Sequence, residues 1–206
     1  MSSIYQITMK IQFILNILLL SILFSCQDEN SLIGDQYFEE GEYTKAVEAY
    51  NEYLSLKPRH VKTIYNRGRC YQELGEYKKA LEDFNTVIKL DPINENALLS
   101  IGQEMYRREE YKSATFYSEK VLEKDPNNTM AYYLMGRAHH KQGHIRDAIH
   151  NYTTAINLSA DFGEAYLHRG ALKLYLKQNK SACQDLQKAA NLNVEGAMEA
   201  LNKNCK

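Results

Sequence analysis

The chain has 206 residues, of which 44% are apolar, and a formal net charge of −1. This length and composition suit one elongated folded domain. Because the charge is so close to zero, electrostatic attraction to nucleic acid is not implied and no nucleic-acid partner is expected.

The chain begins with a short apolar segment. Residues 11–24 form a nearly unbroken apolar run, preceded by Lys10, and no acidic residue occurs before Asp28. The run is shorter than the roughly 20 residues of a membrane-spanning helix and favours the core of a signal peptide. Met1 and Met9 are both possible starts, and an ordinary cleaved signal or an uncleaved anchor stays an alternative.

The end of that run, Leu23-Phe24-Ser25-Cys26, resembles a bacterial lipobox. The resemblance implies a lipoprotein signal peptide over residues 1–25, lipid on Cys26 and a short tether over residues 26–30. Two or more acyl chains give stable anchoring, since each buried CH₂ contributes about 0.8 kcal/mol. The residues after Cys26 resemble those of outer-membrane lipoproteins, including surface lipoproteins of the Bacteroidota. The expected location is the bacterial cell envelope, on either side of the outer membrane.

Small residues recur every 34 positions through the rest of the chain. The glycines of this series are Gly34, Gly68, Gly102, Gly136 and Gly170, and the alanines are Ala46, Ala80, Ala114, Ala148 and Ala182. The three prolines, Pro58, Pro92 and Pro126, keep the same step. A fixed period of this length indicates one helical hairpin copied five times.

Each copy reads as two helices, called helix A and helix B here. In the second copy, apolar and aromatic residues at helical spacing predict helix A over residues 61–74 and helix B over residues 77–90. Gly75 separates the two helices, and Pro92 stops the second because proline cannot continue a helix. We expect Gly68 and Ala80 to lie where the helices approach closely, since larger side chains there would separate the axes.

These residues resemble the tetratricopeptide repeat, whose pattern is matched in order by Gly68, Tyr71, Ala80, Phe84 and Pro92. The resemblance implies an all-α, right-handed superhelical solenoid over residues 31–194. Its units are expected at about 27–60, 61–94, 95–128, 129–162 and 163–196. The pattern departs where Met105 and Ser118 replace aromatic residues and where Ala160 replaces proline. Residues 195–206 are expected to form a helix that caps the last repeat.

Three cysteines remain besides Cys26. If the chain turns near Asn193, an antiparallel pair of helices brings Cys183 and Cys205 to one level, which predicts a disulfide between them. The bond would close a loop of about 20 residues and contribute roughly 3 kcal/mol. Two unpaired thiols are the alternative, and Cys70 is expected to pack as a small apolar residue.

No nucleophile motif, phosphate-binding loop or zinc pattern occurs in the sequence. The best metal candidates are His139, His140 and His144, but Gly143 ends the helix before the third histidine. Metal ligation is therefore not expected. We expect no catalytic residues, no cofactor and no small-molecule substrate.

The binding surface follows from the resemblance, in which certain helix-A positions line the concave side of the solenoid. In this sequence those positions hold flat aromatic residues and long hydrogen-bond donors: Lys62, Tyr65, Asn66, Arg69, Gln103, Tyr106, Arg107, Tyr133, Arg137, His140, His168 and Tyr175. Tyrosine and arginine are enriched at binding hot spots, and amide side chains can hydrogen-bond an extended backbone. A concave face without a dedicated ligand stays the alternative.

The leading hypothesis is a non-enzymatic, lipid-anchored scaffold that binds a peptide or partner protein in its concave groove. The alternative is an accessory or receptor subunit for secretion, surface glycan handling or envelope biogenesis that binds one exported client. The carboxylate-gripping pattern of some co-chaperones is absent, because of its places in the first three repeats only Asn66 carries a fitting residue.

Overall fold

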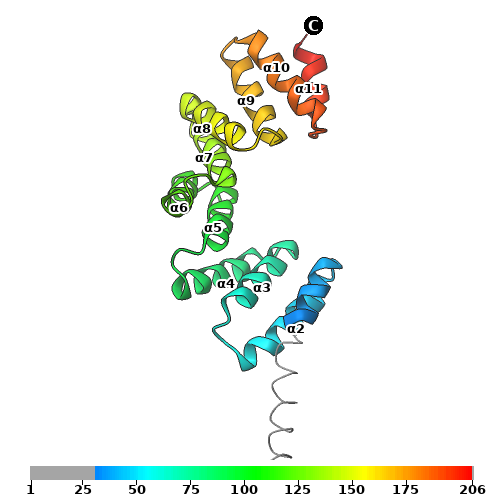
Figure 1. Ribbon diagram of the computed structural model, residues 1–206, viewed down its shortest axis with the longest axis vertical. Helices are drawn as coiled ribbons and strands as arrows, with labels where there is room; N and C mark the ends of the chain where they lie inside the picture. Colours follow the sequence, from blue (N-terminus) through cyan, green and yellow to red (C-terminus); the bar gives the residue numbers. More distant parts are fainter. Residues whose placement is uncertain (1–30, 206) are drawn as a thin grey trace, which may run out of the picture. The chain divides into compact units, whose positions relative to one another are not determined.

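The computed structural model describes residues 31–205, and within this range it contains α-helices and turns but no strand. Figure 1 shows the helices following one another through short connections. The predicted all-α class and the order of two helices per repeat are confirmed. The predicted helix B of the second repeat coincides with the observed one, Tyr77–Leu90.

The described chain divides into two compact units at Pro92 and Ile93. The first holds a helix over residues 31–39, followed by α2 (Tyr43–Leu56), α3 (Val61–Glu73) and α4 (Tyr77–Leu90). The second holds α5 (Glu95–Arg107), α6 (Tyr111–Lys124), α7 (Thr129–Lys141), α8 (Ile145–Leu158), α9 (Gly163–Tyr175), α10 (Asn179–Asn191) and α11 (Ala197–Asn204). The sequence predicted one elongated domain. A repeat chain can divide in this way because each repeat contacts only its neighbours.

The turn between helices A and B uses the same left-handed backbone in each hairpin. Gly41, Gly75 and Gly143 provide it without a side chain, with φ between 74° and 79°. The two other hairpins place Glu109 (φ 65°) and Lys177 (φ 60°) there. A residue with a Cβ atom is strained in this region, so these two turns are held by the helices on either side.

Asparagine and proline mark the borders between repeats. The side chains of Asn94 and Asn128 accept hydrogen bonds from the backbone of α5 and α7 and cap their first turns. Helices α2, α4 and α6 end two residues before a proline. Helix α8 ends at the same place although Ala160 replaces the proline. Packing between repeats is therefore sufficient to end helix B at this position when proline is absent.

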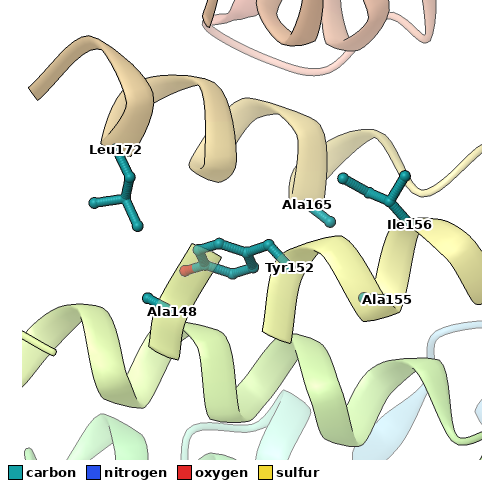
Figure 2. Close-up of a cluster of buried hydrophobic side chains, with 6 residues drawn as sticks. All are labelled: Ala148, Tyr152, Ala155, Ile156, Ala165 and Leu172. Atoms are coloured by element: carbon teal, nitrogen blue, oxygen red, sulfur yellow. The ribbon is translucent and has the colours of Figure 1, made fainter. Parts of the chain in front are cut away.

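The periodic small residues are buried where the helices meet. A Cβ atom on Gly136 would lie 2.7 Å from the ring of Tyr152, so no larger residue fits without movement. Figure 2 shows this ring of α8 among Ala148, Ala165 and Leu172. The periodic alanines are between 0% and 2% exposed. The glycine in each hairpin therefore makes room for a large side chain, which comes from helix B in every hairpin but the third.

In the third repeat, a side chain from the following repeat fills the space beside the glycine. Ser118, in place of an aromatic residue, is too small to reach Gly102, and its hydroxyl donates to the backbone oxygen of Ala114. The methyl group of Leu134 from α7 fills the space instead, 3.0 Å from where a Cβ atom of Gly102 would lie. A side chain of the following repeat thus replaces the missing aromatic ring.

Buried ion pairs recur at a spacing of three repeats. The guanidinium of Arg67 makes two hydrogen bonds to Asp83, at 2.6 and 2.8 Å. Arg169 does the same to Asp185, at 2.7 and 2.9 Å. The second repeat thus has the same buried ion pair as the fifth.

The chain ends with α11, which packs against α10 and buries Ala197 completely. The chain turns before it at Asn193, whose φ is 57°. A disulfide joins Cys183 of α10 to Cys205, with their Cα atoms 5.6 Å apart. The bond ties the last helix of the described chain to the last repeat.

Candidate functional site

The residues expected on the concave face fall into two groups, one in each compact unit. Helix α3 of the first unit carries Lys62, Tyr65, Asn66 and Arg69. Helices α5, α7 and α9 of the second carry Gln103, Tyr106, Arg107, Tyr133, Arg137, His140, His168 and Tyr175.

The first group is organised by the carboxylate of Asp35, which is not among the predicted binding residues. Asp35 accepts hydrogen bonds from the amide of Asn66 at 2.8 Å and from the hydroxyl of Tyr50 at 2.7 Å. The ammonium of Lys62 lies 2.8 Å from its other oxygen. Burial alone would raise the pKa of Asp35, but these three donors outweigh it and lower the pKa. The polar groups of Lys62 and Asn66 thus have a partner within the protein.

The aromatic residues of the first group also find internal contacts. The guanidinium of Arg69 lies 5.2 Å from the ring centroid of Phe38, a cation–π arrangement. The ring of Tyr65 lies 5.6 Å from that of Phe84. We conclude that the first group is largely occupied by contacts that stabilise the hairpins.

The second group contains a compact set of rings around one cation. We call Tyr106, Tyr133, Arg137, Tyr152 and His168 the Arg137 cluster. The guanidinium of Arg137 lies 4.2 Å from the ring centroid of Tyr106 and 5.7 Å from that of Tyr133. In the described chain it makes these ring contacts and forms no ion pair. Arg137 is therefore a partly desolvated cation without a carboxylate.

His168 holds the rings of the cluster together. Its imidazole stacks on the ring of Tyr152 at 5.6 Å and lies 5.8 Å from that of Tyr133. Burial, followed by the charges of Arg137 and His140, lowers the pKa of His168 to about 4. The imidazole is therefore neutral at pH 7 and can accept or donate one hydrogen bond.

Tyr152 provides a buried polar group that lacks a partner. The residue is 0% exposed, and its hydroxyl oxygen makes no hydrogen bond within residues 31–205. Burial raises the pKa of this phenol, so the hydroxyl keeps its proton. A buried hydroxyl without a partner costs free energy, and such groups mark places where a ligand or water completes the structure.

The remaining predicted residues lie outside this cluster. Arg107 and Arg108 both bond to Glu104, which is 4% exposed. Gln103 is exposed, and Tyr175 at the end of α9 is 73% exposed. Burial lowers the pKa of His140, which is not among the ring contacts. The structure therefore brings together only part of the predicted set.

Two residues that complete these groups were missed because they face inward or belong to helix B. Asp35 directly follows Gly34, just as Arg137 directly follows Gly136. Aligning the repeats at their glycines would therefore have identified Asp35. Tyr152 was read only as a repeat-pattern residue, because nothing in the sequence shows that its hydroxyl has no acceptor.

The histidines considered as metal ligands make other contacts. A ring nitrogen of His139 lies 3.0 Å from the amide nitrogen of Asn151, and the His139 ring lies 5.9 Å from that of His144. Across residues 31–205, no group of three or more His, Cys, Asp or Glu residues could hold a metal ion. Burial raises the pKa of the Cys70 thiol to about 12, which makes it a poor nucleophile.

The proposed lipid site at Cys26 and the signal segment before it lie outside the described residues. Among residues 31–205, the helices are all too short or too polar to cross a membrane.

The paired helices, their buried small residues and the repeated left-handed turn define an all-α helical-repeat protein. A family model described as tetratricopeptide repeat matches residues 33–99. A model described as anaphase-promoting complex, cyclosome, subunit 3 matches residues 84–155. A zebrafish (Danio rerio) protein, outer dynein arm-docking complex subunit 4, is 47% identical over 38 residues, which is 8% of its own length.

Solved structures share the fold over most of the chain. MamA from Desulfovibrio magneticus RS-1 has a TM-score of 0.72 at 23% identity and covers 81% of this chain and 94% of its own. PilW, described as a type IV pilus biogenesis factor, has a TM-score of 0.73 at 19% identity, covering 81% and 77%. YrrB, described as having an unusual peptide-binding site, has a TM-score of 0.65 at 20% identity, covering 83% and 89%. These likenesses confirm the tetratricopeptide-repeat fold.

Proposed function

We propose that this protein is a non-enzymatic scaffold that binds a peptide or partner protein on the helix-A face of its repeats. The observation that carries the proposal is the Arg137 cluster, where an unpaired guanidinium lies against two tyrosine rings. Tyrosine and arginine dominate binding hot spots because they offer large contact areas and directed hydrogen bonds. The second compact unit is the main binding region in this proposal.

Binding without turnover is supported by the chemistry of the candidate groups. The cluster offers a cation, neutral phenols and a neutral imidazole, with no activated nucleophile beside a base. Among residues 31–205 the free cysteine is Cys70, which is buried and keeps its proton. A purified chain that hydrolysed members of a substrate panel would contradict the non-enzymatic part of the proposal.

We also propose that the protein is lipid-anchored through Cys26 in the bacterial cell envelope. The lipobox-like residues and the preceding apolar run support this. The disulfide between Cys183 and Cys205 supports an exported location, because disulfides persist in oxidising compartments. Labelling cells with a radioactive fatty acid tests the anchor. We expect the label on the wild-type chain and none on Cys26→Ala; equal labelling of both would refute lipid on Cys26.

The binding face is tested by site-specific photo-cross-linking in intact cells. A photoreactive residue at Gln103 on α5 reports on the helix-A face, and one at Glu119 on α6 is the control; both positions are exposed. We expect cross-links to a client from Gln103 and few from Glu119. Arg69→Glu combined with Arg137→Glu should weaken client capture with helicity unchanged. Cross-links mainly from Glu119, or unchanged capture by the double variant, would refute the proposed face.

A further inference from the structure

The first and fourth repeats use the same framework with different polar residues. Positions 102 residues apart occupy the same place in the repeat, so Asp35 corresponds to Arg137 and Tyr50 to Tyr152. Asn66 of the second repeat likewise corresponds to His168 of the fifth. A Cβ atom on the preceding glycine would meet the tyrosine ring in both places. The two phenols therefore extend from helix B past helix A in the same way.

The first repeat shows what this framework holds when it is complete. The hydroxyl of Tyr50 and the amide of Asn66 both donate to one oxygen of Asp35, at 2.7 and 2.8 Å. The ammonium of Lys62 binds the other oxygen. A carboxylate is thus the group that collects the donors at this position.

The fourth repeat keeps the tyrosine hydroxyl and lacks the carboxylate, while His168 and Glu164 stand in the places of the donors Asn66 and Lys62. Arg137 replaces Asp35, and a guanidinium cannot accept the hydrogen bond that Tyr152 has to donate. The hydroxyl is buried without a partner, and Arg137 makes no ion pair among the residues described. Glu164, in the place of Lys62, is exposed and forms no ion pair with Arg137. The guanidinium of Arg137 and the hydroxyl of Tyr152 therefore have no hydrogen-bond acceptor among the described residues.

From this comparison we infer that the Arg137 cluster binds a carboxylate of the client peptide, which takes the role that Asp35 has in the first repeat. A guanidinium binds carboxylate through two parallel hydrogen bonds, and the phenol adds a charge-assisted one. The neutral His168 brings no second charge and stacks on the Tyr152 ring. The carboxylate comes from an Asp or Glu side chain or from the client's C-terminus. The inference rests on the proposed binding function and names its ligand chemistry.

The test uses the full chain and pools of ten-residue peptides immobilised on beads. One pool carries a central glutamate with both ends blocked, and a second carries glutamine instead. A third carries glutamine and a free C-terminal carboxylate, which separates the two sources. We expect about tenfold stronger retention of the wild-type chain by the glutamate pool or the free-carboxylate pool than by the blocked glutamine pool.

Variants assign that preference to the cluster. Arg137→Gln should abolish it, and Tyr152→Phe should reduce it about fivefold, since the acceptor loses one charge-assisted donor. Glu164→Gln should increase retention by removing a nearby like charge. The matched control is Arg146→Gln, because Arg146 is an exposed arginine of the same repeat that lies on α8, outside the cluster. This control should keep the full preference, and circular dichroism should show the same helicity for every variant.

Each outcome decides the inference. Equal retention by all pools would overturn the carboxylate site and leave the proposed binding function standing. A preference that survives Arg137→Gln would overturn the assignment to this cluster. Retention by no pool would also overturn the carboxylate site, and the proposed function would then be judged by the Gln103 cross-links. A preference lost in Arg137→Gln and kept in Arg146→Gln establishes the site.

Discussion

Replacing Tyr152 by phenylalanine removes one oxygen atom that has no partner in the described chain, while Tyr50→Phe removes one that donates to Asp35. Both side chains are 0% exposed and both rings pack against a helix glycine. The two substitutions remove the same atom from the same place in two repeats. They therefore compare a satisfied and an unsatisfied buried hydroxyl with packing held nearly constant.

The expected changes in unfolding free energy have opposite signs. A hydrogen bond to a charged acceptor is worth about 1.5–3 kcal/mol. In Tyr50→Phe, Asp35 keeps its hydrogen bonds from Asn66 and Lys62. The loss of unfolding free energy should therefore lie at the low end of this range, at about 1.5 kcal/mol. An unsatisfied buried polar group costs about 1–3 kcal/mol, so Tyr152→Phe should stabilise by about 1 kcal/mol.

Urea denaturation followed by circular dichroism measures both values without any ligand. The midpoint should fall for Tyr50→Phe and rise for Tyr152→Phe, with the slope unchanged. A loss of stability in Tyr152→Phe equal to that in Tyr50→Phe would show that the Tyr152 hydroxyl has a partner in the free protein. That result would refute the reasoning.

Three further predictions follow from the described contacts. Glu109→Gly should stabilise the chain by about 1 kcal/mol in urea denaturation, because φ is 65° at this residue. Gly75→Ala should destabilise the chain, because it places a Cβ atom in the same left-handed region. A destabilising Glu109→Gly or a stabilising Gly75→Ala would contradict the backbone strain. Replacing Cys183 and Cys205 by serine should cost about 3 kcal/mol, and adding reductant should then have no further effect. The pKa of His168, measured by NMR, should be about 4. Because the folded pKa is lowered, the unfolded chain binds more protons between about pH 6.5 and 4, so stability falls as pH drops through this window. His168→Asn should flatten that fall, and an unchanged profile would contradict the assignment.

The sequence by itself determined the repeat. Glycine and alanine at a constant spacing predicted buried crossings, and Gly75 predicted the turn that follows α3. These features are local, since a hairpin of two helices is set by residues within one repeat of 34. The sequence also placed Tyr106, Tyr133, Arg137 and His168 in one functional set from their positions in the repeat.

Only the tertiary structure decided which of those residues meet. The Arg137 cluster draws side chains from α5, α7, α8 and α9, and they touch only when successive repeats stack. The left-handed turn at Glu109 likewise follows from packing on both sides, because the residue itself disfavours that backbone. Whether a buried hydroxyl has an acceptor depends on distances between helices, which no pattern along the chain contains. The partner of Tyr50 and the missing partner of Tyr152 are therefore properties of the folded molecule.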